Sequence, residues 1–189
     1  MASQPAARLS VEEYLDLERA ATEKHEFIDG EMVAMAGGSP RHALIGANVL
    51  VALRGRRRSR CAVFTGDLKV FIDQRRMIAY PDVTVVCGEP VFLDEKRDVV
   101  KNPSFVVEVL SPSTEDFDRG KKTTFYRLLP SMQEFLLVGQ EPVFIEQNRR
   151  LPDGTWQVIL HQDPQAVIHL ESLGVELPVA AVYADLEWY

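Results

Sequence analysis

The sequence predicts an α+β fold, in which a central mixed β-sheet has one or two helices on each side. Apolar residues recur at helical spacing in three segments: after Ser10, from Pro40 to about residue 57, and from about Thr114 to Leu129. Between and after these segments lie short runs rich in valine, isoleucine and phenylalanine, which are typical of strands. The region after about residue 140 indicates a β-hairpin appended to that core. With 189 residues, the chain is expected to form one domain, residues 1–189.

Turn and cap signals place the elements in order. The segment Ser10-Val11-Glu12-Glu13 fits a capping box ahead of a short helix. Asp29-Gly30 favours a two-residue turn between two strands, and Ser39-Pro40 suits the start of a long helix. Further strands are expected in CAVFTG, LKVFID, MIAYPDVTVVC, SFVVEVLS, EFLLVG, PVFIEQN and LPDGTWQVILH, and the tail LGVELPVAAVYADLEWY suggests a strand and a helical turn.

Charge argues against a protein that grips nucleic acid over a wide surface. The formal net charge is −7 at pH 7, whereas such proteins are usually basic. One local positive patch, RGRRRSR, contains Arg54, Arg56, Arg57 and Arg58. These arginines either contact nucleic-acid phosphates or simply complement the C-terminal end of a helix, and the two interpretations stay open.

The sequence also bears on compartment. It has no run of 18 or more apolar residues, and MASQPAARLS lacks the pattern of a secretory signal, so we expect no membrane association. Cys61 and Cys87 lie in apolar, strand-like contexts and form no metal-binding spacing, so we interpret them as reduced core residues. Together these features predict a cytoplasmic protein.

An acid interrupts the apolar run FVVEVL. In a strand, Phe105, Val107 and Val109 would face one way and Glu108 the other, with apolar neighbours on both faces. Glu108 is therefore expected to be at least half buried. A buried carboxylate needs a cation, a metal ion or a proton, and a structural arginine partner is the alternative to a functional role.

Asp82 has a similar position, because it follows Pro81 at the start of the run VTVV. If Asp82 and Glu108 meet at one end of the sheet, two charges about 5 Å apart repel by roughly 3 kcal/mol. A divalent ion between them would reverse that repulsion, and oxygen ligands suit Mg²⁺ or Mn²⁺. The alternative is that Asp82 only caps a turn after the proline.

The helix that follows Glu108 supplies a cation. Lys122 and Tyr126 are four residues apart and share one face, and Asp118 lies one turn ahead of Lys122. The Lys122 ammonium can reach back toward the acids and stabilise charge on a phosphate, whereas Lys121 points about 100° away. The alternative is an exposed helix-surface pair between Asp118 and Lys122.

Five segments resemble the Uma-type family of restriction-endonuclease-like proteins, within the PD-(D/E)XK nuclease superfamily. They are KHEFIDGEMVAM, SPRHALIGANVLVAL, YPDVTVVC, PSFVVEVLSPST and DRGKKTTFYRLLPSMQEFLLV, and they occur in the family's order. The resemblance runs from about residue 8 to 185. It implies a restriction-endonuclease-like core, a metal-dependent phosphodiesterase site, DNA as substrate and a homodimer.

The resemblance maps onto individual residues. Pro81-Asp82 matches the PD element and Glu108 the second acid, with the backbone carbonyl of Val109 as a further metal ligand. The superfamily's usual lysine position, two residues after that acid, holds Leu110 in this chain. The family's K-x-x-x-Y arrangement on the next helix matches Lys122 and Tyr126.

Two N-terminal residues also match. Glu26 corresponds to an acid that joins the same site in similar folds, although it could instead be a surface strand residue. His42 matches a family position, but we leave it out of the core set because a histidine at a helix start more often makes a local hydrogen bond.

The leading hypothesis is therefore a Mg²⁺-dependent endonuclease that hydrolyses DNA phosphodiester bonds. The alternative is a non-catalytic nucleic-acid or protein interaction module that retains the fold, which the net acidity favours. A small-molecule hydrolase has no support, since the chain contains no Gly-x-Ser-x-Gly and no G-x-G-x-x-G fingerprint. No motif marks base-reading residues.

Overall fold

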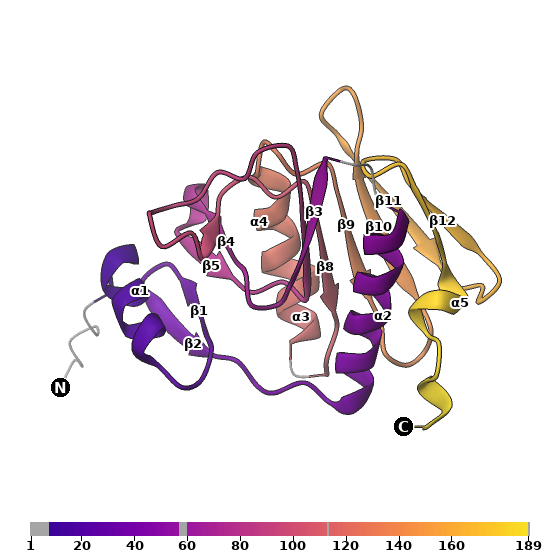
Figure 1. Ribbon diagram of the computed structural model, residues 1–189, viewed down its shortest axis with the longest axis horizontal. Helices are drawn as coiled ribbons and strands as arrows, with labels where there is room; N and C mark the ends of the chain where they lie inside the picture. The colour runs from indigo at the N-terminus through magenta and orange to yellow at the C-terminus, as the bar shows by residue number, and fades with distance from the viewer. Residues whose placement is uncertain (1–7, 57–59, 113, 189) are drawn as a thin grey trace.

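The computed structural model describes residues 8–56, 60–112 and 114–188, and two β-sheets form its framework (Figure 1). A five-stranded sheet lies toward the N-terminus and a six-stranded sheet forms the middle of the molecule. The order of strands is β2-β1-β5-β4-β7 in the first and β11-β10-β9-β8-β6-β3 in the second, and β12 and β13 form a separate pair. The α+β class predicted from the sequence is confirmed.

The five-stranded sheet contains the hairpin predicted at Asp29-Gly30. Asp29 and Gly30 have φ values of 46° and 95°, as a tight turn with positive φ at both central residues requires. The strands are β1 (His25–Ile28), β2 (Glu31–Ala34), β4 (Lys69–Ile72), β5 (Met77–Ala79) and β7 (Val99–Val100).

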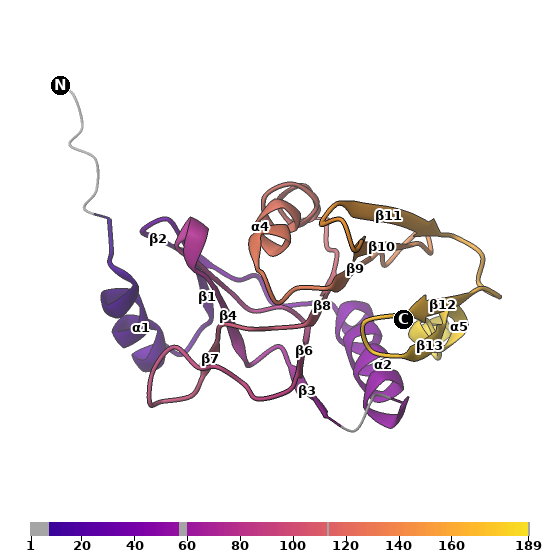
Figure 2. The same cartoon turned by 90° about the horizontal axis from the view of Figure 1, so that it is seen from above.

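The six-stranded sheet is antiparallel except between β8 and β9, which run parallel. Helices cover both faces of its middle strands: α2 lies on one side and α4 on the other (Figure 2). The strands are β3 (Cys61–Thr65), β6 (Val83–Cys87), β8 (Phe105–Val109), β9 (Glu134–Val138), β10 (Ile145–Arg150) and β11 (Trp156–His161).

The helices begin where the cap signals indicate. Ser10 caps α1 in a complete capping box with Glu13, and the Ser39 hydroxyl accepts a hydrogen bond from the His42 amide at the start of α2. The helices are α1 (Val11–Ala20), α2 (Pro40–Arg56), α3 (Glu115–Phe117), α4 (Thr123–Leu128) and α5 (Val179–Val182), with a 3₁₀ turn η1 (Asp73–Arg75) and another, η3 (Leu186–Trp188). None of the described helices is both long and apolar enough to cross a bilayer.

The helix expected between residues 114 and 129 is divided into three parts. Between α3 and α4 lies a π-helical turn, η2 (Asp118–Lys122), in which the Thr123 amide bonds to the Asp118 carbonyl. The Thr123 hydroxyl donates to the same carbonyl oxygen. Such a turn changes which side chains face the sheet, and it is the local distortion on which the site depends.

Strand β8 has the predicted alternation. Phe105, Val107 and Val109 pack in the apolar cluster on the α2 side, whereas Val106 and Leu110 pack in the cluster on the α4 side. All five strand residues are buried. Because β8 is paired on both edges and covered on both faces, Glu108 has little access to water.

One strand prediction is wrong and one is confirmed. MIAYPDVTVVC is not one strand: β5 and β6 belong to different sheets, and the chain leaves the first sheet before Pro81, which has no amide hydrogen for a ladder. The C-terminal β-hairpin predicted after residue 140 is confirmed, while β10 and β11 extend the six-stranded sheet. The separate C-terminal hairpin is β12 (Val167–Leu170) with β13 (Val175–Pro178).

The prediction of reduced cysteines is also wrong. Cys61 and Cys87 form a disulfide between β3 and β6, where the two residues are direct cross-strand partners. Antiparallel register decides this pairing, because it brings the two Cα atoms to 4.0 Å. The spacing of two cysteines along the chain carries no information about such a register.

Candidate active site

The side chain of Lys122 is the centre of a buried cluster of charges. Its Nζ lies 2.8 Å from Glu26 Oε1, 3.2 Å from Glu108 Oε1 and 3.2 Å from Asp118 Oδ1. All four side chains are less than 10% exposed. The cluster therefore joins three parts of the chain: strand β1, strand β8 and the helical segment after β8.

The π-helical turn places the lysine. Asp118 and Lys122 are its first and last residues, and both are buried, whereas the adjacent Lys121 is exposed. Tyr126, four residues further on, is completely buried. The spacing of four residues thus points Asp118, Lys122 and Tyr126 at the same face of the sheet. The alternative of an exposed Asp118–Lys122 surface pair is excluded, because both side chains are buried.

Glu108 is held by two donors on one oxygen. The Tyr126 hydroxyl donates to Oε1 at 2.5 Å, and the Lys122 ammonium contacts the same atom. Burial raises the pKa of Glu108 well above its ordinary value; Lys122 opposes this, and the carboxylates of Asp118 and Asp82 add to it. Positive charge close to Glu108 favours its ionised form.

Asp82 lies at the same end of the sheet as Glu108. It comes directly before β6, whose first residue, Val83, pairs with Val107, so continuing the register places Asp82 opposite Glu108. The Val109 amide donates to Asp82 Oδ2 at 2.7 Å. Burial raises the pKa of Asp82 as well. The two acids thus come from neighbouring strands at one end of the sheet, and their sharing of a metal ion stays a prediction.

His42 approaches Asp82 from the other face. Its Nε2 atom lies 3.6 Å from Asp82 Oδ2, and the His42 side chain is 19% exposed. A positive charge at this position lowers the pKa of Asp82 and so opposes the effect of burial. Sequence reasoning set this histidine aside as a helix-start residue, and only the packing of α2 against β6 brings it to the site.

Glu26 reaches the cluster from the five-stranded sheet. It is 7% exposed, so it is not the surface strand residue that the sequence left open. Its Oε1 accepts a hydrogen bond from the Tyr80 amide at 3.4 Å in addition to the contact with Lys122. Glu26 therefore ties β1 to the segment that leads from β5 to β6.

Lys122 remains charged in this environment. Burial by itself lowers the pKa of an ammonium, but the charges of Glu108, Glu26 and Asp118 outweigh burial and raise the pKa of Lys122 well above its ordinary value. In this arrangement the lysine cannot accept a proton near neutral pH. It can hold carboxylates together and stabilise negative charge that develops nearby.

The oxygen atoms fit a hard divalent ion. Within the described residues, no three histidine, cysteine, aspartate or glutamate side chains are arranged around a common point for a metal. Mg²⁺ does not need such a set, because it is commonly held by one or two carboxylates and keeps several waters. Asp82 and Glu108 offer two carboxylates, and the Val109 carbonyl offers a third oxygen donor, of a second kind.

Asp118 is the site residue that sequence reasoning missed. Its side chain is 3% exposed, and its buried Oδ1 makes no hydrogen bond besides the ion pair with Lys122. The available signal was the spacing Asp118, Lys122, Tyr126 at intervals of four, which is the same face of a helix. That spacing alone cannot distinguish a buried face from an exposed one.

Arg54, the one of the four predicted nucleic-acid-binding arginines whose side chain the structure describes, lies away from this cluster. Arg54 is exposed near the end of α2, about 18 Å of helix axis from His42. The side chain of Arg56 and the whole of Arg57 and Arg58 lie outside the described residues. A role of these four arginines in binding nucleic acid stays a prediction.

Comparisons of fold and of sequence with known proteins identify the family. The fold is similar to that of a solved structure titled "a putative nuclease belonging to DUF820" from Anabaena variabilis, with a TM-score of 0.75 over 93% of this chain and 98% of that one, at 15% identity. Residues 11–180 match the Uma2 family, described as "Putative restriction endonuclease". The chain belongs to the Uma2 family.

Two curated relatives come from Synechocystis. The chain is 36% identical to uncharacterized protein slr1290 over 97% of this chain and 96% of that protein. It is 39% identical to uncharacterized protein sll1609 over 78% of this chain and 84% of that protein. The resemblance noted in the sequence is thus confirmed at the level of family and fold.

Proposed function

We propose that this protein is a Mg²⁺-dependent (or Mn²⁺-dependent) endonuclease that hydrolyses DNA phosphodiester bonds. Asp82, Glu108 and the Val109 carbonyl would hold the ion, and Lys122 and Glu26 would complete the catalytic set, with Tyr126 in support. The observation that carries the proposal is the convergence of three buried carboxylates on Lys122, with Asp82 at the end of the adjoining strand.

The balance of charge supports a cation. Glu26, Glu108, Asp118 and Asp82 offer four negative charges against the one ammonium of Lys122. Burial raises the pKa values of both proposed metal ligands, and added positive charge would favour their ionised forms. When bound, Mg²⁺ would supply that charge, polarise the phosphate and lower the pKa of a coordinated water.

The protein's own groups orient these acids. The Val109 amide donates to one oxygen of Asp82. The Tyr126 hydroxyl and Lys122 both contact Oε1 of Glu108, and neither of them contacts Oε2. Burial raises the pKa of Tyr126 well above its ordinary value, so its hydroxyl remains a donor. Lys122, held charged by its neighbours, would stabilise the phosphate as negative charge builds up.

Plasmid nicking by the purified protein in MgCl₂ tests the activity. We expect wild-type protein to convert supercoiled plasmid to open circles and Glu108→Gln to lose at least about 100-fold of that rate, because a metal ligand is removed. Glu134→Gln is the matched control: Glu134 is a fully buried carboxylate on the neighbouring strand β9, bonded to Gln147 and Ser172 outside the site. If Glu108→Gln cuts as fast as wild type, the site assignment is wrong.

Calorimetry with MgCl₂ separates the enzyme from the alternative. We expect binding by the wild type and by Glu134→Gln, and none by Glu108→Gln. A wild-type protein that neither binds Mg²⁺ nor nicks DNA would establish the other interpretation, an interaction module that retains the fold.

We also propose a homodimer and a cytoplasmic location. Light scattering on a size-exclusion column gives the mass directly, and a mass near 21.3 kDa would exclude the dimer. In the cytoplasm the Cys61–Cys87 bond would be one of the uncommon disulfides of a reducing compartment.

A further inference from the structure

Helix α1 buries an acid on its apolar face. Of its ten residues, three are buried: Tyr14, Leu15 and Glu18. The Glu18 side chain is 2% exposed, and it lies outside the cluster around Lys122. A buried carboxylate needs several hydrogen-bond donors, and the donors to Glu18 identify the segments of the chain that α1 contacts.

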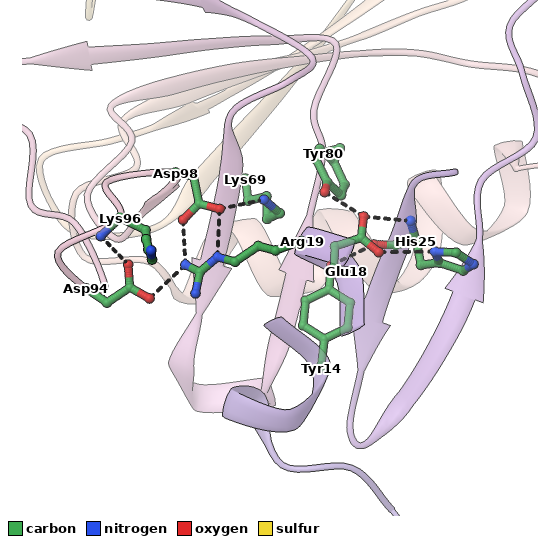
Figure 3. Close-up of polar contacts among 9 residues, drawn as sticks. All are labelled: Tyr14, Glu18, Arg19, His25, Lys69, Tyr80, Asp94, Lys96 and Asp98. Atoms are coloured by element: carbon green, nitrogen blue, oxygen red, sulfur yellow. Dashed lines mark hydrogen bonds and ion pairs between the residues drawn. The ribbon is translucent and has the colours of Figure 1, made fainter. Parts of the chain in front are cut away.

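Glu18 holds two separate segments of the chain. Its Oε1 accepts from the Tyr80 hydroxyl at 2.6 Å and from the His25 amide at 3.0 Å, and its Oε2 lies 3.1 Å from His25 Nδ1 (Figure 3). Burial, together with the hydrogen bond to Glu18, raises the pKa of Tyr80 far above its ordinary value, so this hydroxyl stays protonated and donates.

A second residue of α1, Tyr14, also forms a hydrogen bond with His25. The Tyr14 hydroxyl donates to the His25 carbonyl at 2.6 Å, and its ring stacks on Phe27 with centroids 4.9 Å apart. Tyr14 and Glu18 are one turn apart and share a face of the helix. Together they hold the amide and the carbonyl of one strand residue.

Both held segments lead directly into the proposed site. His25 precedes Glu26 on β1, and Tyr80 lies two residues before Asp82. The Tyr80 amide also donates to Glu26 Oε1. The Glu18 carboxylate, which lies outside the site, therefore holds the backbone of the residue before Glu26 and the side chain of the residue two positions before Asp82.

The other polar contacts of α1 go elsewhere. Arg19 pairs with Asp94 and Asp98, of which Asp98 also pairs with Lys69, and Figure 3 shows this group beside the contacts of Glu18. These ion pairs attach α1 to the loop before β7. Arg19 thus attaches the helix to the rest of the protein, and the adjacent Glu18 contacts the segments that contain the site acids. Because different residues make these contacts, mutation can separate the two roles.

We propose that Glu18 is a positioning residue, which holds Glu26 and Asp82 in the correct positions relative to each other and to Lys122. The inference rests on the endonuclease function proposed above. Site groups act only when held close to their productive geometry by a supporting set of hydrogen bonds. Glu18 supplies such support across the gap between β1 and the segment that leads from β5 to β6.

Three variants test the role. Glu18→Gln keeps the size of the side chain but has one accepting oxygen for three donors, and Tyr80→Phe removes one donor while keeping the Tyr80 amide. We expect Glu18→Gln to lower kcat for plasmid nicking roughly 10- to 100-fold with KM within about twofold, and Tyr80→Phe to act in the same direction but less. Arg19→Gln is the control, with kcat within about twofold of wild type although its melting temperature falls.

Amide hydrogen exchange gives a readout that does not need activity. Exchange in residues 25–28 and 79–83 should accelerate in Glu18→Gln and not in Arg19→Gln. Equal acceleration in both variants, or wild-type kcat in Glu18→Gln, would overturn the positioning role. If the wild type itself does not cut DNA, the endonuclease proposal fails instead, and the exchange comparison still decides whether Glu18 holds these segments.

Discussion

The Nζ atom of Lys122 lies 2.8 Å from Oε1 of Glu26, so the helical segment after β8 is joined to the first strand of the chain. Glu26 belongs to the five-stranded sheet, whereas Glu108, which contacts the same ammonium, belongs to the six-stranded sheet. The lysine therefore bridges the two sheets. A substitution that removes its charge leaves buried acids of both sheets without their cation.

Replacing this lysine should damage both stability and activity. Lys122→Met leaves Glu26, Glu108 and Asp118 buried without their cation, which should lower the free energy of unfolding by about 3–5 kcal/mol and abolish nicking. Lys121→Met changes an exposed neighbour and should stay within about 0.5 kcal/mol of wild type. Urea unfolding of the two variants measures the difference, and similar midpoints would contradict the buried ion pairs.

Replacing Asp118 should reduce nicking activity less than replacing Lys122, with which it pairs. In Asp118→Asn the amide oxygen can still face the ammonium, but one of the three charges around Lys122 is lost. We expect plasmid nicking to slow roughly 10-fold, the lower range for a residue that orients another. Glu115→Gln, an acid of the same helical segment that is 44% exposed and pairs with Arg119, should nick at the wild-type rate. Equal rates in all three proteins would remove Asp118 from the site.

Reduction of the disulfide should destabilise the protein. Cys61 and Cys87 are 26 residues apart, and closing a loop of that length is worth about 3.5 kcal/mol in the chain-entropy model. The melting temperature should fall in dithiothreitol, and the Cys61→Ser/Cys87→Ser protein should melt at the lower temperature with or without the reductant. Two thiols reacting with a thiol reagent in the native, unreduced protein would show that the sequence-based prediction was correct after all.

Asp98 should make the protein sensitive to acid. Hydrogen bonds from Arg19, with further support from Lys69, hold the pKa of Asp98 far below its ordinary value despite partial burial. Because the pKa is lower in the folded protein, this stabilisation is present above the unfolded value of about 3.9 and is lost as the pH falls below it. Thermal unfolding at pH 7 and pH 3 should therefore show a smaller difference in Asp98→Asn than in wild type, and the variant should melt lower at pH 7. An unchanged pH dependence would contradict the role of this carboxylate.

Several features could be predicted from the sequence because they depend on local spacing. Alternation along FVVEVL shows that Glu108 lies on the face opposite Phe105 and Val107, and the capping signals at Ser10 and Ser39 place the starts of α1 and α2. The same reasoning singled out Asp82, Glu108 and Lys122, which the fold brings to one end of the sheet. Their roles in catalysis are a proposal.

Other features depend on which distant segments meet. The sequence contains Asp118, Glu18 and the two cysteines, but it does not show that Asp118 is buried, that Glu18 grips His25 and Tyr80, or that Cys61 faces Cys87. Local periodicity determines the direction of each side chain relative to its own strand or helix. What lies opposite that side chain is decided only by the packing of one sheet against another and by the register between strands. The free energies of packing and of strand pairing are sums over many residues that are far apart in the chain, so no local segment determines them.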